Sequence, residues 1–104
     1  MQAEKLCPSP HIEAADLNGK DLAVTIKGYD FHDVGPEKAR KGVLFYDEFD
    51  RGMVINRTNL KRIIGIYGND ADAWKGKKVT LYPSETDFNG RTVPCIRVRE
   101  KAPA

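Results

Sequence analysis

Alternating apolar and polar positions predict a long first β-strand with a bend in its middle. In residues 22–27 a large aliphatic side chain stands at every second position, which is the pattern of a half-buried strand. Gly28 interrupts the alternation, and Tyr29 and Phe31 continue it with the opposite parity. Because a glycine within a strand often marks a bulge or a sharp bend, we expect one at Gly28.

Two further short strands are predicted after this one. Residues 33–42 are polar and basic and contain a Gly-Pro pair, so we expect an exposed loop there. Residues 43–46 and 53–55 are apolar runs of strand length, joined by a turn over residues 47–52. Strands this close in sequence pair most simply as an antiparallel meander.

A helix follows, because apolar residues recur at the spacing of one helical face: Leu60, Ile63, Ile64 and Tyr67. Thr58 offers a side-chain oxygen just before this face and is the predicted N-cap, and Gly68 with Asn69 supplies the stop. Residues 70–76 then form a short turn, and we expect Trp74 in this turn to fold back over the core.

The last quarter of the chain predicts a β-hairpin with one apolar and one basic face. Two alternating segments, residues 77–82 and 93–99, flank Asn89-Gly90, a pair that readily adopts the positive φ angles of a tight turn. Successive strand residues face opposite sides. The inward face then holds Val79, Leu81, Ile96 and Val98, and the outward face holds Lys78, Thr80, Tyr82, Cys95, Arg97 and Arg99.

This order of elements predicts an OB-fold-like five-stranded barrel (β-β-β-α-β-β) with one helix between strands three and four. A bend at Gly28 fits, because the first strand of such a barrel takes part in both halves of the sheet. An SH3-like barrel and a small α+β domain remain open as alternatives. We expect a flexible lead-in over residues 1–11, a single domain over residues 12–100 and a tail over residues 101–104.

Composition agrees with a globular single domain. The chain has 104 residues, of which 40% are hydrophobic, enough for one modest core. No apolar run approaches the roughly 20 residues that span a bilayer, and the first residues lack the apolar stretch of a secretion signal, so we expect a protein of the cytoplasm of the cell that makes it. Cys7 and Cys95 are far apart and are expected to be free thiols.

The net charge of +2 is too small to identify a nucleic-acid binder by itself. The charges are segregated along the chain, however. Basic residues gather near positions 38–41, 57–62, 75–78 and 91–99, and acidic ones near 47–50 and 70–72. Segregation of this kind can give a nearly neutral protein one positive face.

Several segments resemble small phage and prophage proteins of about one hundred residues. They are Asn56-Arg57-Thr58-Asn59, Tyr67-Gly68-Asn69-Asp70 with Trp74-Lys75-Gly76-Lys77, and Leu81-Tyr82-Pro83 with Phe88-Asn89-Gly90-Arg91 and Ile96-Arg97-Val98-Arg99. The resemblance covers residues 14–99 and implies a phage origin and a compact β-rich domain. Because phage replication and recombination modules commonly encode single-stranded DNA-binding proteins of OB type, it also favours that function. It assigns no functional residue.

A single-strand binder needs cations that neutralise phosphates and aromatic faces on which bases stack. In an OB-fold, the loops between strands one and two and between strands four and five flank the binding groove. The outward strand positions and these loops supply the candidate residues Lys27, Lys38, Arg40, Lys41, Tyr82, Phe88, Arg91, Arg97 and Arg99. The strand aromatics Tyr29, Phe31, Phe45 and Tyr46 are expected in the core instead.

Two other interpretations stay open. A basic strand face is also an ordinary solvated surface, and the acidic clusters suit a protein-interaction module that binds a host or phage protein. Exposed strand edges also permit a homodimer. We expect no enzyme and no cofactor, because the common catalytic motifs are absent and the clustered carboxylates fall in predicted turns.

A metal site is also not expected. Cys7 and His11 have a spacing that can chelate, but a structural zinc needs four ligands. The remaining pair, His32 and Cys95, forms no paired motif, and His32 is expected on the surface.

Overall fold

A computed structural model describes residues 11–34 and 37–103 as a mainly β protein. Its elements, in chain order, are η2 (Ala14–Leu17), β1 (Leu22–Val34), β2 (Ala39–Tyr46), β3 (Met53–Val54), α1 (Arg57–Tyr67), η3 (Ala71–Trp74), β4 (Lys78–Phe88) and β5 (Arg91–Val98). This is the predicted order of three strands, a helix and two strands. The predicted lead-in lies outside the described residues, apart from His11. None of the helices in these residues has the length and apolar character to cross a membrane.

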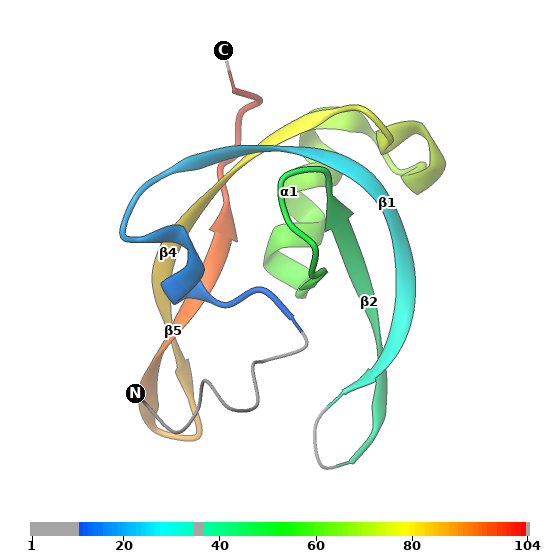
Figure 1. Cartoon of the computed structure of the whole chain (residues 1–104). Coiled ribbons are helices and arrows are strands. Elements are labelled where there is room, and N and C mark those ends of the chain that lie inside the picture. Colours follow the sequence, from blue (N-terminus) through cyan, green and yellow to red (C-terminus); the bar gives the residue numbers. More distant parts are fainter. Residues whose placement is uncertain (1–10, 35–36, 104) are drawn as a thin grey trace.

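One five-stranded antiparallel sheet in the order β3-β2-β1-β4-β5 contains all the strands. β1 belongs to both halves of this sheet, because its first residues pair with β4 and its later residues pair with β2. The pairing register shifts between Ile26 and Gly28, which confirms the predicted bulge. Figure 1 shows β1 arching from the β4–β5 hairpin on one side of the molecule to the β1–β2 ribbon on the other.

The sheet is not closed into a barrel within the described residues, since β3 and β5 form its two edges. The β-rich architecture predicted from the sequence is confirmed in its strand order and pairing, whereas the OB-fold-like barrel predicted with it is not confirmed. The antiparallel meander of β1, β2 and β3 and the final hairpin are also confirmed.

The predicted loop over residues 33–42 is wrong. β1 continues to Val34 and β2 begins at Ala39, with Asp33 paired to Arg40. The polar sequence of this segment reflects a ribbon that extends beyond the core, where side chains on both faces meet solvent. The turn between the strands contains Lys38, whose φ of 53° is left-handed. Residues 35–36 of the predicted loop lie outside the described residues.

The N-cap of α1 is Asn56, so the prediction of Thr58 is wrong. The Asn56 side chain accepts a hydrogen bond from the Asn59 backbone N–H at 2.9 Å, and its own backbone is extended. Asparagine caps at least as well as threonine, and Asn56 stands where the strand conformation ends. The predicted stop is confirmed, because Gly68 ends the helix with a φ of 90° and donates to the Ile64 carbonyl.

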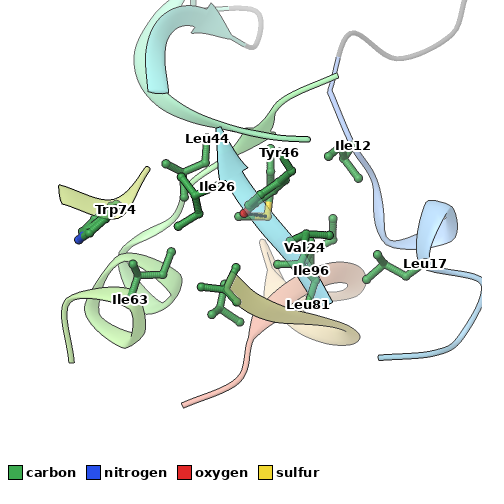
Figure 2. Close-up of a cluster of buried hydrophobic side chains, with 13 residues drawn as sticks. Ile12, Leu17, Val24, Ile26, Leu44, Tyr46, Ile63, Trp74, Leu81 and Ile96 are labelled. Atoms are coloured by element: carbon green, nitrogen blue, oxygen red, sulfur yellow. Dashed lines mark hydrogen bonds between the residues drawn. The ribbon is translucent and has the colours of Figure 1, made fainter. Parts of the chain in front are cut away.

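The core lies between the sheet and α1. Figure 2 shows Trp74 and Ile63 at one end of a cluster of buried side chains, and Ile12 and Leu17 at the other. Trp74 is buried, as predicted, and its indole N–H donates to the Gly68 carbonyl at 2.9 Å. The inward residues predicted for the final hairpin are also confirmed, because Val79, Leu81, Ile96 and Val98 are all buried.

The final hairpin has the predicted Asn-Gly turn, with φ angles of 52° at Asn89 and 77° at Gly90. This two-residue turn makes Phe88 and Arg91 a hydrogen-bonded pair, and pairs then alternate along the ladder. Ile96 and Val98 are at non-hydrogen-bonded positions of this ladder. Their backbone N–H and C=O groups therefore point away from β4, toward the free edge of β5.

A buried asparagine of α1 satisfies that edge. The Asn59 side chain donates to the Ile96 carbonyl at 2.9 Å and accepts from the Val98 N–H at 3.0 Å. Arg62 donates to the Val98 carbonyl at 2.9 Å. Unpaired backbone groups at an edge strand invite pairing with another chain, so α1 protects the β5 edge at these residues.

Candidate functional site

A groove of about 610 Å³ opens between the β1–β2 ribbon, the first turn of α1 and η3. We call it the aromatic groove, because two exposed aromatic residues of β1 stand in its wall. Its lining also includes the charged residues Asp30, Arg40, Lys41 and Arg57 and an apolar set made up of Val43, Leu44, Ile55, Leu60, Ala71 and Trp74. Asp30 and Lys41 stand at the alternate strand positions, whose side chains face the other side of the ribbon, so the cations on the side of the aromatic pair are Arg40 and Arg57.

Tyr29 and Phe31 supply the exposed aromatic surface of the groove. Their side chains are 45% and 51% exposed, although aromatic rings of a small protein usually contribute to its core. The two ring centroids lie 6.3 Å apart with the planes at 83°, in an edge-to-face arrangement. The expectation that both belong to the core is therefore wrong, whereas Tyr46 is fully buried as expected and Phe45 is half-buried.

A hydrogen bond fixes the Tyr29 ring in place. Its hydroxyl donates to the Asp72 carboxylate at 2.9 Å, which ties β1 to η3 across one end of the groove. The same hydrogen bond to the Asp72 carboxylate raises the pKa of Tyr29, so the hydroxyl remains a neutral donor at physiological pH.

Cations stand beside the aromatic pair. The Arg40 guanidinium lies over the Phe31 ring at 5.4 Å from its centroid, within the range of a cation–π interaction. Arg57 lines the groove from α1, and both arginine side chains are exposed. Positive charge and flat aromatic faces are thus presented together, which is the combination that binds single-stranded nucleic acids.

The residues predicted as binding residues divide between several places. Arg40 and Lys41 line the aromatic groove, and Lys38 is exposed in the turn at the end of the same ribbon. Lys27 is exposed at the β1 bulge, and Arg91 is exposed beside the turn of the final hairpin. The Phe88 side chain lies outside the described part of the structure.

Tyr82, Arg97 and Arg99 lie on the outer face of the final hairpin, as predicted, and do not themselves line the aromatic groove. The Arg99 guanidinium covers the Tyr82 ring at 3.7 Å from its centroid. It also forms a bidentate salt bridge with the Asp21 carboxylate, in which Nε and Nη2 donate to the two carboxylate oxygens at 3.0 and 3.1 Å. The hydrogen bonds from Arg99 lower the pKa of Asp21.

Further contacts satisfy the polar groups of this outer face. Arg62 reaches around the β5 edge to donate to the Tyr82 hydroxyl at 2.9 Å, and Arg97 contacts the Asn56 side-chain oxygen at 3.5 Å. A hollow of about 300 Å³ remains beside Tyr82, Arg62 and Arg99. Because the Tyr82 ring face is covered and Arg99 is paired, this surface is less available to bases and phosphates than the aromatic groove.

Tyr29, Phe31 and Arg57 are the groove residues that the sequence prediction missed. One signal was present, because the alternation changes parity at Gly28, and the bulge there keeps the two aromatics on the face of Val24 and Ile26, farther along the strand. The pattern does not reveal where the core ends along a strand, so aromatics beyond that point are misassigned.

The acidic clusters have structural partners. Asp70 caps η3 by accepting from the Asp72 N–H, as expected for a turn aspartate. Glu48 accepts from both the backbone N–H and the hydroxyl of Thr25. Among residues 11–34 and 37–103, no group of three or more His, Cys, Asp or Glu side chains is arranged to hold a metal ion.

No protein-family model, curated protein or solved structure matches this chain. The function of the aromatic groove therefore has to be inferred from its own geometry and chemistry.

Proposed function

We propose that this protein is a non-enzymatic, largely sequence-independent single-stranded DNA-binding protein that holds its ligand in the aromatic groove. The observation that carries the proposal is the exposed pair of Tyr29 and Phe31, with Arg40 over the Phe31 ring. Exposed aromatic faces and adjacent cations are what a single strand needs, because bases stack on the rings while phosphates meet the cations.

The groove favours stacking over base reading. A ring face accepts any base, and each stacked base contributes about 1–3 kcal/mol. The lining contains more apolar side chains, such as Leu44 and Leu60, than side chains that could hydrogen-bond a base edge, such as Asn56. Binding should therefore depend little on sequence and should weaken as salt rises.

The arrangement of the strands supports an OB-like relationship. The order β3-β2-β1-β4-β5, with α1 between β3 and β4, is the strand neighbourhood of an OB-fold opened between β3 and β5. OB-folds bind oligonucleotides near strands two and three and the loop between strands one and two, and the aromatic groove includes β2 and adjoins that loop. With the resemblance to phage proteins, this favours a role in phage DNA replication or recombination.

Fluorescence polarisation with a labelled oligo-dT tests the proposal. The wild-type protein should bind at low salt, and its affinity should fall with a log–log salt slope of about −1.4 if two cations each contact one phosphate. Tyr29→Ala and Phe31→Ala should each weaken binding by about 1–3 kcal/mol, without loss of folding, because both rings are exposed.

Two controls separate stacking from simple charge attraction. An abasic oligonucleotide of the same length should bind more weakly than oligo-dT, because it keeps the phosphates and lacks the bases. Leu22→Ala removes an exposed apolar side chain outside the groove and should leave binding unchanged. Absence of binding at low salt, or full affinity in the double variant Tyr29→Ala/Phe31→Ala, would reject the proposal.

A protein partner is the second candidate function, because the groove has an apolar lining with Trp74 and a Leu60 side chain that is 37% exposed. Such a lining also suits an apolar side chain of another protein. A pull-down from host lysate that recovers one stoichiometric partner after nuclease treatment would favour this candidate. Loss of the partner after the same treatment would favour DNA.

A further inference from the structure

Two histidines from distant parts of the sequence meet on the side of the β1–β2 ribbon opposite the aromatic pair. His11 Nε2 lies 3.0 Å from His32 Nδ1, and the ring centroids lie 5.3 Å apart. His32 belongs to β1 and stands next to Phe31, so it points to the other face of the strand. The expectation that His32 is a simple surface residue is therefore wrong, because it is half-buried and paired.

Neighbouring contacts position both rings. His11 forms a parallel β-bridge with Gly52, and the next residue, Ile12, is buried in the core and donates to the Gly52 carbonyl at 2.8 Å. The His32 ring packs edge-to-face against Phe45, with the centroids 5.8 Å apart. The two nitrogen atoms are thus brought together by anchored backbone on both sides.

The distance between the nitrogens suits a metal chelate. With metal–nitrogen bonds of about 2.0–2.1 Å, two ligands at right angles lie about 2.9 Å apart, and two at the tetrahedral angle lie about 3.3 Å apart. The observed 3.0 Å is close to the right-angle value. Tetragonal geometry with imidazole ligands is typical of Cu²⁺ and Ni²⁺, whereas Zn²⁺ prefers tetrahedral sites.

We propose that His11 and His32 form a two-imidazole binding site for a divalent transition ion of tetragonal preference, Cu²⁺ or Ni²⁺. In the metal-free protein one ring donates its N–H to the other. On binding, that proton moves to the second nitrogen of the same ring, both facing nitrogens give their lone pairs to the ion, and no net proton is released. The rings turn so that both lone pairs meet at the ion.

The remaining coordination positions belong to water, as far as the described residues supply ligands. Cys7 precedes His11 by four residues in the sequence and is tested separately below. Charged groups around the histidine pair change its affinity for a metal cation, because positive groups repel the ion and a carboxylate attracts it. Lys41 stands directly opposite His32 on β2, Arg51 donates to the His11 carbonyl at 3.3 Å, and Asp30 stands on the His32 side of β1.

Calorimetric titration of the tag-free, full-length chain with Cu²⁺ and with Ni²⁺ tests the site. We expect one ion per chain, and nitrogen hyperfine splitting in the spectrum of the Cu²⁺ form by electron paramagnetic resonance. His11→Gln and His32→Asn should each reduce the affinity at least about tenfold, because a single imidazole remains. Both replacements retain an amide that can hydrogen-bond to the other histidine, so the fold is expected to persist, as circular dichroism checks.

The outcomes separate a built site from incidental binding. If the ion raises the melting temperature of the wild type and of neither histidine variant, the proposal stands. If Cys7→Ser also weakens binding, the site has a third ligand and the proposal stands with it. Affinity that is unchanged in folded His11→Gln and His32→Asn would overturn the proposal. The groove variants Tyr29→Ala and Phe31→Ala should bind the ion normally, so this result is independent of DNA binding.

Discussion

The final hairpin and the β1–β2 ribbon carry similar residues but use them differently. In the hairpin, Tyr82 is covered by Arg99, and that guanidinium is paired with Asp21. In the ribbon, Phe31 is 51% exposed and Arg40 lies 5.4 Å from its ring centroid. An aromatic residue and an arginine therefore form a closed contact in one region and an open one in the other.

The position of the core explains this difference. The hairpin lies over the core, and α1 reaches its edge through Asn59 and Arg62, which bond to the β5 backbone. Beyond the bulge at Gly28, the ribbon extends past the packed cluster, so its aromatic faces stay accessible. Whether a strand aromatic stabilises the fold or forms a binding surface thus depends on where the core ends.

The largest expected effect is a loss of stability when the hydrogen bonds at the β5 edge of the hairpin are removed. Asn59→Ala removes both side-chain hydrogen bonds to Ile96 and Val98 and leaves two backbone groups unpaired, which should lower the free energy of unfolding by about 2–4 kcal/mol. Urea denaturation measures the change. Thr58→Ala, at an exposed position in the same turn, is the matched control and should change stability by less than about 0.5 kcal/mol. Equal losses in the two variants would show that the edge bonds are unimportant.

Two glycines, one packed against β2 and one at the bulge of β1, test how tightly these regions are packed. A Cβ at Gly52 would approach Val43 Cγ1 at 2.3 Å, so Gly52→Ala should destabilise the protein by about 1–3 kcal/mol. A Cβ at Gly28 meets nothing within 4 Å, so Gly28→Ala should be nearly neutral, although Gly28 adjoins the bulge. Melting temperatures of both variants give the comparison. A larger loss at Gly28 would mean that the bulge itself requires glycine.

The two arginines compare the open and closed contacts directly, at equal change of charge. Arg40→Ala should weaken oligo-dT binding about two- to fivefold, because it removes a cation beside the exposed Phe31 ring. Arg99→Ala should leave binding within about twofold, because this guanidinium already pairs with Asp21 on the outer face of the hairpin. Polarisation titrations at one salt concentration measure both. The reverse order would place the DNA on the hairpin.

The smallest expected effect is a pH dependence of the stability that the Arg99–Asp21 pair contributes. Hydrogen bonds from Arg99 lower the pKa of Asp21 in the folded state, so the unfolded chain binds the proton more readily. The pair therefore contributes stability above about pH 4, and this contribution is lost as the pH falls through the folded-state pKa. Asp21→Asn should flatten the acid side of the stability curve slightly. An unchanged curve at low ionic strength would show that the pair contributes nothing measurable.

Local patterns identified most elements of the fold. The Asn89-Gly90 turn, the alternation through Val79 and Val98 and the stop at Gly68 each depend on neighbours in the sequence, and each is confirmed. The N-cap was placed two residues late, because both Asn56 and Thr58 carry a suitable side-chain oxygen and the end of β3 decides between them.

The candidate site was predicted only in part. Arg40 belongs to the proposed binding surface, but the aromatic residues expected to bind with it, on the final hairpin, lie elsewhere. Charge and residue type are properties of the sequence, whereas the exposure of Tyr29 depends on which elements cover it. Nor does the sequence reveal that His32 meets His11, since the two stand 21 positions apart in the chain.

The sequence by itself determined the order of the strands and the helix, the tight final turn and the inward face of the hairpin. These follow from side-chain alternation and backbone preference, which act over a few residues. Only the tertiary structure decided that the sheet stays open at β3 and β5, that α1 satisfies the β5 edge and that Tyr29 and Phe31 face solvent. Each of these depends on contacts between distant segments, because packing determines which surfaces are buried.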